Sequence, residues 1–264
     1  MAQNFDISKQ VSIYYSTMGS QSEKKIAEQR INDYMEECYS EWHELFVQIN
    51  EIEIDSKVDT SSMNHSFFPF LVLNHIIQKG FDRITDIDGF YKELFDVYIS
   101  NFKKIAKNQN CKLSSFLFTK FVLLFVNLAM KDKSNERFEL TLSGFKSVLN
   151  GEEDFETRLM HARFIAKYIR FLHEEIYDKV GCFEAKNECV FKNKYCKHFI
   201  EKINDNLYQV QYKKENEANS DIPVDDILIG LSYAYMWVSE PISNNDFTLL
   251  SDVQLYDDID NCLF

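Results

Sequence analysis

Residues 112–131, KLSSFLFTKFVLLFVNLAMK, decide the fold of this chain. Their apolar side chains recur at helical spacing on two adjacent stripes, so the predicted helix is apolar over much of its circumference. One stripe contains Leu113, Phe116, Leu117, Phe121, Leu124 and Leu128, and the other contains Phe118, Val122, Phe125, Val126 and Ala129. Such a helix needs neighbours on several sides, as an inner helix of a stack has. Its most apolar run, 116–130, falls short of the roughly 20 residues that span a bilayer, so we predict no transmembrane helix.

The same helical spacing continues along almost all of the 264 residues, with polar breaks at regular intervals. The 7 glycines and 3 prolines are too few for the tight turns of an all-β fold. The predicted helices span 4–16, 21–39, 42–54, 64–79, 85–107, 112–131, 137–149, 154–179, 184–214, 224–238 and 244–260. They group in pairs with a period of about 40–55 residues, which is typical of HEAT repeats. We therefore predict an all-α, right-handed α-solenoid of about five HEAT-type pairs, forming a single array over residues 1–264.

Charge is distributed unevenly along the chain, whose formal net charge is −13. Residues 1–100 hold 8 basic and 17 acidic side chains, and residues 101–214 hold 21 basic and 14 acidic ones. Residues 215–264 hold 11 acidic side chains and no basic one. The negative net charge argues against a protein that coats nucleic acids non-specifically and against attraction to anionic membranes. The net-positive middle segment, in contrast, suits binding to phosphates. The first ten residues lack the pattern of a secretory leader, so we expect the 6 cysteines to be reduced, in the cytosol or nucleus.

One polar stripe on the predicted helix 154–179 carries three cations. At about 100° per residue, Arg163, Lys167 and Arg170 fall within about 60° of one another, and Glu174 lies on the same stripe. We therefore expect an exposed basic ridge on this helix. Two interpretations stay open. The ridge is either a solvated face with a few ion pairs or a surface that binds phosphates. In the second case, three cations predict a slope of about −2 to −3 for the logarithm of the binding constant against the logarithm of the salt concentration.

No catalytic residue, cofactor or metal site is predicted, so we expect the chain not to be an enzyme. The glycines are all isolated, which excludes a glycine-rich phosphate loop. Residues 86–89, Asp-Ile-Asp-Gly, resemble a calcium loop, but Phe95 stands where a bidentate Glu is needed, so we interpret them as a turn between helices. Cys182, Cys189 and Cys196 recur every seven residues, which is about 10.5 Å along a helix. Thiolates bound to one zinc ion lie within about 4 Å of one another, so we expect that these cysteines do not share a metal ion.

Several segments resemble the N-terminal region of the importin-β, or karyopherin, superfamily. Residues 22–28, SEKKIAE, resemble the start of that family's second helix, where a charged run precedes an Ala-Glu pair. Trp42 opens the next helix, and residues 67–77, FFPFLVLNHII, resemble the aromatic-aliphatic helix that follows. The resemblance assigns residues 1–110 to an importin-β-like, Ran-facing part of the array.

Three later segments are similar to the exportin-T, or tRNA exportin, family. They are KLSSFLFTK at 112–120, the helix from RFI at 163–165 to FLHEEIYD at 171–178, and GLSYAYMWVS at 230–239 followed by ISNNDF at 242–247. Their shared order and spacing carry the resemblance, which extends over nearly the whole chain. Residues 111–264 are accordingly expected to be exportin-like repeats.

The resemblance implies a nuclear transport receptor that works by stoichiometric binding. It would bind Ran in its GTP form and mature tRNA, contact the FG-repeat proteins of the nuclear pore, and shuttle between nucleus and cytoplasm without membrane insertion. The candidate Ran contacts, on the inner surface of second helices, are Lys24, Glu28, Asn74 and Lys120. The candidate tRNA contacts are the three cations of the ridge, Arg163, Lys167 and Arg170.

Other interpretations stay open at this point. The chain could be a karyopherin for protein cargo, or a HEAT-repeat scaffold that does not discriminate GTP-Ran from GDP-Ran. An all-helical enzyme would reveal itself by a metal or nucleotide bound on purification. If the ridge does not bind tRNA, we expect the contacts around Lys192, Lys194 and Lys197.

Overall fold

The computed structural model of the chain describes residues 7–15, 20–54, 60–108, 111–151, 154–178, 183–216 and 224–239. These ranges contain helices and the short turns that join them, and no strand occurs within them. The prediction of an all-α fold is therefore confirmed for the described part of the chain.

The helices follow one another with short connections. They are α1 (Ile7–Tyr15), α2 (Gln21–Glu37), η1 (Cys38–Ser40), α3 (Trp42–Asn50), α4 (Thr60–Gly80), η2 (Phe81–Arg83), α5 (Ile87–Lys107), α6 (Lys112–Lys131), α7 (Asn135–Asn150), α8 (Phe155–Asp178), α9 (Ala185–Val190), η3 (Phe191–Cys196), α10 (Lys197–Asn216) and α11 (Asp225–Ser239). The predicted helix 184–214 is interrupted by η3, which is a π-helical segment. The predicted helix 244–260 lies outside the described residues.

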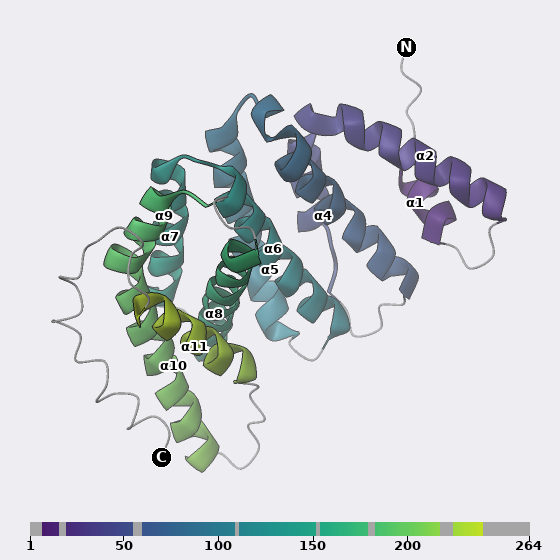
Figure 1. The fold of residues 1–264 in the computed structure, drawn as a ribbon. Coiled ribbons are helices and arrows are strands. Elements are labelled where there is room, and N and C mark those ends of the chain that lie inside the picture. The colour runs from purple at the N-terminus through teal and green to yellow at the C-terminus, as the bar shows by residue number, and fades with distance from the viewer. Residues whose placement is uncertain are drawn as a thin grey trace.

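The helices lie in two layers, with the N-terminal helices at one end of the molecule (Figure 1). One layer contains α3, α5 and α7 and continues into α9, η3 and α10. The other contains α4, α6, α8 and α11, packed side by side in that order. Helices α1 and α2 pack on each other and against α4. From α3 to α8, consecutive helices therefore alternate between the layers, and α4, α6, α8 and α11 each pack on the helix that precedes them in the chain.

Aromatic rings at the centre of the core join two successive helix pairs. Tyr98 on α5 contacts Phe125 on α6 and Phe145 on α7, with ring centroids 5.6 and 6.2 Å apart. It also contacts Phe164 on α8 at 4.6 Å, and its hydroxyl lies 2.7 Å from Nδ1 of the buried His161. One side chain thereby fixes the positions of four helices relative to one another. We call these rings the Tyr98 cluster.

Helix α6 is buried on several sides, as its sequence predicted. Every residue of its two apolar stripes is buried except Phe116, which is half-buried. Among the described residues, it is the one helix long and apolar enough to cross a membrane, with a mean hydropathy of 1.8, and 61% of that stretch is buried inside the protein. Packing against α4, α5 and α8 accounts for this apolar composition.

A buried carboxylate holds the junction between α6 and α7. Asp132, directly after α6, is 5% exposed and accepts hydrogen bonds from the Arg137 guanidinium at 2.5 and 3.1 Å. It also accepts the backbone N–H of Ser134 at 2.8 Å, and Ser134 begins α7 by accepting the backbone N–H of Arg137 at 3.4 Å. Burial, and then the nearby Asp132 carboxylate, raise the pKa of the Tyr91 hydroxyl. The turn between these helices is thus fixed by one acid with several partners.

Replacing this acid should destabilise the whole fold. We expect Asp132→Ala to lower the free energy of unfolding by about 3 kcal/mol, because it leaves a partly buried guanidinium and a backbone N–H without their acceptor. Urea denaturation followed by circular dichroism measures the change. The control is Asp88→Ala, which removes an 83% exposed carboxylate 3.4 Å from the same arginine and should change stability by less than about 0.5 kcal/mol. Equal losses in the two variants would contradict the role given to burial.

Helices α8 and α11 approach each other closely at Gly230. A Cβ atom at this position would lie 2.4 Å from the carbonyl oxygen of Ala166 and 2.5 Å from its Cβ. Because backbone stands on the other side of the contact, no side-chain rotation can relieve the clash. The contact therefore requires glycine on α11.

Gly230→Ala should accordingly displace α11 from α8 and lower the free energy of unfolding by about 1–3 kcal/mol. Ser232→Ala is the matched control, because Ser232 is an exposed residue two positions along the same helix. Thermal and urea unfolding of both variants measure the difference. A Gly230→Ala protein as stable as the parent would show that the helices do not pack at this distance.

Candidate functional site

Four cations lie beside aromatic rings on the layer formed by α4, α6, α8 and α11. We call this surface the cation–aromatic face. Its cations are Lys120, Arg163, Lys167 and Arg170, and its rings are Phe67, Phe116, Phe118, Phe171 and Tyr233. These residues come from four helices, so the packing of the layer is what brings them together.

Lys167 on α8 stands between two rings. Its Nζ lies 5.5 Å from the centroid of Phe118 on α6 and 5.6 Å from that of Phe171, one turn further along α8. It donates a hydrogen bond to the Thr119 hydroxyl at 3.3 Å, and it forms no ion pair with a carboxylate of the described residues. Burial lowers the pKa of this ammonium below its ordinary value. Lys167 is therefore a half-buried cation with no ion pair among the described residues, and the nearby Asp226 carboxylate raises its pKa by less than burial lowers it.

Lys120 on α6 repeats this environment one helix away. Its Nζ lies 4.5 Å from the centroid of Phe67 on α4 and 5.4 Å from that of Phe116, one turn earlier on α6. Burial lowers its pKa as well, and within the described residues it has no ion-pair partner. We call Lys120 and Lys167 the clamped lysines. Each is held by one ring from its own helix and one from the preceding helix of the layer.

The two arginines of the face are neutralised. Arg163 pairs with Asp226 of α11 at 3.3 Å, and its guanidinium lies over the Phe118 ring. Arg170 pairs with Glu174 at 2.8 Å, and the Tyr233 hydroxyl donates to the same carboxylate oxygen at 2.9 Å. The hydrogen bond to Glu174 raises the pKa of Arg170. Within the described residues, the cations of the face that form no ion pair are consequently the clamped lysines.

The basic ridge predicted from the sequence is half-buried, whereas we expected it to be exposed. Side-chain exposure is 15% for Arg163 and 34% for Arg170, because α6 and α11 flank their stripe on α8. The rotation of about 100° per residue correctly predicted that the three cations of α8 lie on one stripe. Phe118, Tyr233 and Asp226 were missed, because they lie on other helices and no local pattern connects them to this stripe.

The candidate Ran contacts are spread over α2, α4 and α6. On α2, Glu28 is exposed and Lys24 is half-buried. The amide oxygen of Asn74 on α4 accepts a hydrogen bond from Asn127 of α6 at 2.5 Å. Lys120 belongs to the cation–aromatic face. The structure thus groups Lys120 with the candidate tRNA contacts rather than with Lys24 and Glu28.

The second set of candidate tRNA contacts is partly neutralised as well. Lys192, whose side chain is 6% exposed, pairs with Glu188 at 2.8 Å. Lys194 pairs with Glu139 of α7, and this hydrogen bond raises its pKa. Lys197 is exposed. This group therefore offers less free charge than the clamped lysines.

No group of three or more His, Cys, Asp or Glu side chains within the described ranges could hold a metal ion. Cys196 is buried, its thiol lies 3.5 Å from the carbonyl of Ala234, and burial raises its pKa to about 12. Cys189 is half-buried, and Cys182 lies outside the described residues. Asp86 precedes α5 and accepts the backbone N–H of Gly89 at 2.9 Å, so residues 87–89 are the first turn of that helix and not the turn between helices predicted there.

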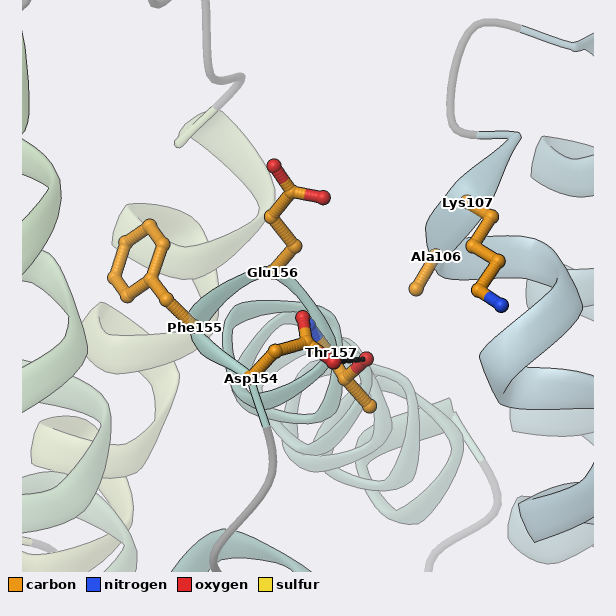
Figure 2. Close-up of a pocket in the computed structure, with 6 residues that line it drawn as sticks. All are labelled: Ala106, Lys107, Asp154, Phe155, Glu156 and Thr157. Atoms are coloured by element: carbon orange, nitrogen blue, oxygen red, sulfur yellow. Dashed lines mark hydrogen bonds between the residues drawn. The ribbon is translucent and has the colours of Figure 1, made fainter.

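A pocket of about 380 Å³ opens between the end of α5 and the start of α8 (Figure 2). It is lined by Ala106, Lys107, Asp154, Phe155, Glu156 and Thr157. The Asp154 carboxylate accepts the backbone N–H and the hydroxyl of Thr157 at 3.0 and 2.8 Å, and these bonds lower its pKa. Figure 2 shows Lys107 across the gap from this pair. Because the Asp154 carboxylate already caps α8, the pocket is a weaker candidate for a functional site than the cation–aromatic face.

The lowered pKa of Lys167 predicts an unusual effect on stability. We expect Lys167→Met to raise the free energy of unfolding near neutral pH, because it removes an ammonium that burial disfavours. The folded state also binds fewer protons than the unfolded state between the lowered pKa and the ordinary value of about 10.4. The parent should therefore gain stability as pH rises through this window, and Lys167→Met should lose that gain. Urea denaturation from neutral to alkaline pH measures both effects.

Arg170→Met is the matched control for this measurement. It removes a cation from the same stripe, but one paired with Glu174, so we expect a loss of about 0.3–0.5 kcal/mol. If Lys167→Met were less stable than Arg170→Met, the two ring contacts and the Thr119 hydrogen bond would outweigh the cost of burial.

Comparison with protein-family models, with curated proteins and with solved structures finds no match to this chain. The resemblance to the exportin-T family accordingly stays a prediction from the sequence segments. The function is inferred from those segments together with the geometry of the cation–aromatic face.

Proposed function

We propose that the chain acts as a karyopherin-type nuclear transport receptor, similar to exportin-T, that binds GTP-bound Ran and tRNA without catalysis. In this proposal the helix pairs are HEAT-type repeats of a right-handed α-solenoid. The pairing of α3 with α4, α5 with α6, α7 with α8 and α10 with α11 supports it, since each pair contributes one helix to each layer. Contact with FG-repeat proteins and shuttling between nucleus and cytoplasm follow from the proposal.

The observation that carries the proposal is the cation–aromatic face on the layer of second helices. Lys120 and Lys167 are cations that form no ion pair within the described residues, and they lie beside half-buried rings. Cations interleaved with aromatic side chains suit a phosphate backbone that carries bases. The face also lies largely in the net-positive segment 101–214. A nucleic acid therefore fits this surface better than a basic protein does.

The N-terminal helices suit a different partner. Residues 1–100 carry 17 acidic and 8 basic side chains, and Glu28 is exposed on α2. In the family that the sequence resembles, the corresponding repeats bind Ran, which is basic. Opposite charge favours encounter between such surfaces. We accordingly assign Lys24 and Glu28 to the Ran surface and Lys120 to the RNA surface.

The Ran proposal predicts discrimination between nucleotide states. The immobilised chain should retain GTP-locked Ran and release GDP-bound Ran. Glu28→Lys should weaken retention about tenfold, because it reverses an exposed charge facing a basic partner. Glu37→Lys is the control, since it makes the same change on α2 about 180° away. Equal retention of the two forms of Ran would favour a HEAT-repeat scaffold instead.

The tRNA proposal predicts a salt dependence set by the clamped lysines. Binding of RNA to the paired arginines releases few counterions. Lys120 and Lys167 should therefore contribute a slope of about −1.4 to −1.8 to the plot of log binding constant against log salt concentration, in place of the −2 to −3 expected from the three cations of the ridge. Lys120→Gln combined with Lys167→Gln should weaken tRNA binding and reduce the slope by this amount. The measurement is tRNA association across a salt series with GTP-loaded Ran present.

The control combines Lys146→Gln with Lys186→Gln, two exposed lysines on α7 and α9 in the other layer. This variant should bind tRNA as the parent does. An unchanged slope in the clamped-lysine variant would place the tRNA contacts elsewhere on the chain.

A further inference from the structure

We propose that two copies of this chain associate through an exposed apolar stripe on α11, with the two helices antiparallel about a two-fold axis at Ser232. The stripe consists of the exposed residues of that helix, which we call the α11 stripe: Asp225, Leu228, Ile229, Ser232, Met236 and Ser239. The inference goes beyond the proposed function, because the contact involves only this chain and needs neither Ran nor RNA.

The α11 stripe is more apolar than the exposed surface of the other helices in its layer. Leu228, Ile229 and Met236 are 52%, 39% and 46% exposed, and none of the other large hydrophobic side chains exposed in the described residues lies on α4, α6 or α8. Those others are Ile26, Val47, Leu140, Tyr208 and Tyr212. At about 100° per residue, the six members of the stripe fall within an arc of about 100°, so its apolar side chains are contiguous. Contiguous exposed apolar surface is typical of an interaction site.

Helix α11 stands at one end of its layer in the described part of the chain. Helix α6 packs between α4 and α8, and α8 packs between α6 and α11. The contacts of α11 with α8 use Asp226, Gly230, Tyr233 and Trp237, and the stripe is centred about 120° around the helix from them. At the other end of the layer, α4 is packed by α1, α2 and α3. End helices of a stack need a polar outer surface, which the α11 stripe does not provide, so a further helix laid on it would continue the layer.

The stripe is complementary to a second copy of itself. When two α11 helices pair antiparallel about Ser232, Leu228 of each copy faces Met236 of the other, because both lie four residues from the axis. The small Ser232 side chain at the crossing lets the helix axes approach to about 8 Å. A contact in which the same residues serve both copies is isologous, so the assembly closes at two chains.

The charge of the stripe selects the antiparallel arrangement. Asp225 is its one charged member, and in an antiparallel pair the two Asp225 side chains lie about 21 Å apart along the helix axes, each near Ser239 of the other copy. A parallel pair would place these two carboxylates opposite each other, which is unfavourable. The net charge of −13 also makes the copies repel one another. Because salt screens this repulsion and leaves the apolar contact, we expect association to strengthen with salt.

The pairing should be weak and should join two candidate sites. One helix pair buries less than the about 1,200–2,000 Å² of a standard interface, so we expect a dissociation constant on the order of 100 µM. Tyr233 of the cation–aromatic face follows Ile229 by one helical turn, so the faces of the two copies flank the two-fold axis. Where the proposed function holds, an RNA that reaches both faces gains from an effective concentration on the order of millimolar.

The orientation is tested by disulfide formation between two copies. Full chains carrying Ser232→Cys are equilibrated with oxidised and reduced glutathione, and covalent dimers are measured on a non-reducing gel against the parent, which has cysteines of its own. We expect Ser232→Cys to link to itself, since residue 232 lies on the axis. Ser239→Cys should stay at the level of the parent, because its two thiols would lie about 21 Å apart, far beyond the span of a disulfide.

The strength is tested by sedimentation equilibrium of the full chain from about 10 to 500 µM, which brackets the expected dissociation constant. Leu228→Gln combined with Met236→Gln keeps the charge and should weaken self-association about tenfold or more, because it removes the apolar contact. The control combines Val47→Gln with Leu140→Gln, which changes two exposed apolar residues on α3 and α7 and should leave association as in the parent. Both variants should keep the helical circular dichroism of the parent.

Several results would overturn the proposal. They are a chain that stays monomeric to about 500 µM, equal association of the two Gln variants, and self-linkage of Ser239→Cys as efficient as that of Ser232→Cys. Protection of the Ser232→Cys thiol from a soluble reagent in a monomeric chain would do the same, because the stripe would then be covered within one chain. Since these assays use neither Ran nor RNA, loss of tRNA binding with self-association intact would refute the proposed function and leave this inference standing.

Discussion

The Tyr98 cluster is the constraint on which the rest of the structure depends. It joins α5, α6, α7 and α8 through ring contacts, and Phe118 extends it toward the surface, with Phe102 and Phe164 each 5.8 Å away. Phe118 is 4% exposed, yet Arg163 and Lys167 lie over its ring. The same side chain is thus part of the core and a wall of the candidate site. The face exists because the core packs α8 against α6.

We expect the clamped lysines to oppose the stability that this core provides. A half-buried ammonium without a carboxylate loses hydration, and cation–π contacts of about 0.5–2 kcal/mol recover only part of that loss. Arg163 and Arg170 on the same face form ion pairs with Asp226 and Glu174, whereas Lys120 and Lys167 form none within the described residues. Partly buried charges normally have an ion-pair partner, and residues that depart from this rule are expected at functional sites. This contrast, rather than the number of basic residues, is the reason that we propose the face as a binding surface.

Local periodicity determined much of the fold in advance. The predicted helix 112–131 has the bounds observed for α6, and the stripes of α6 and α8 were assigned to the correct sides. Contacts between distant segments were out of reach, because Arg163 and Asp226 are 63 residues apart and nothing in either segment specifies the other. Two local features were missed as well: the bond from Arg137 to Asp132, because it depends on the turn geometry after α6, and the π-helical η3. The candidate site was therefore predicted as a stripe on one helix, whereas it is a surface made by four.

The net charge of −13 limits what this surface can bind. A polyanion approaching from a distance meets a negatively charged protein and is repelled, so long-range steering cannot bring it to the face. At physiological salt this repulsion is screened beyond about 8 Å, and only closer contacts with the lysines and rings are attractive. An anionic ligand must therefore either be delivered by a second partner or be attached to the chain. In the proposed complex, GTP-bound Ran is the partner that delivers the tRNA.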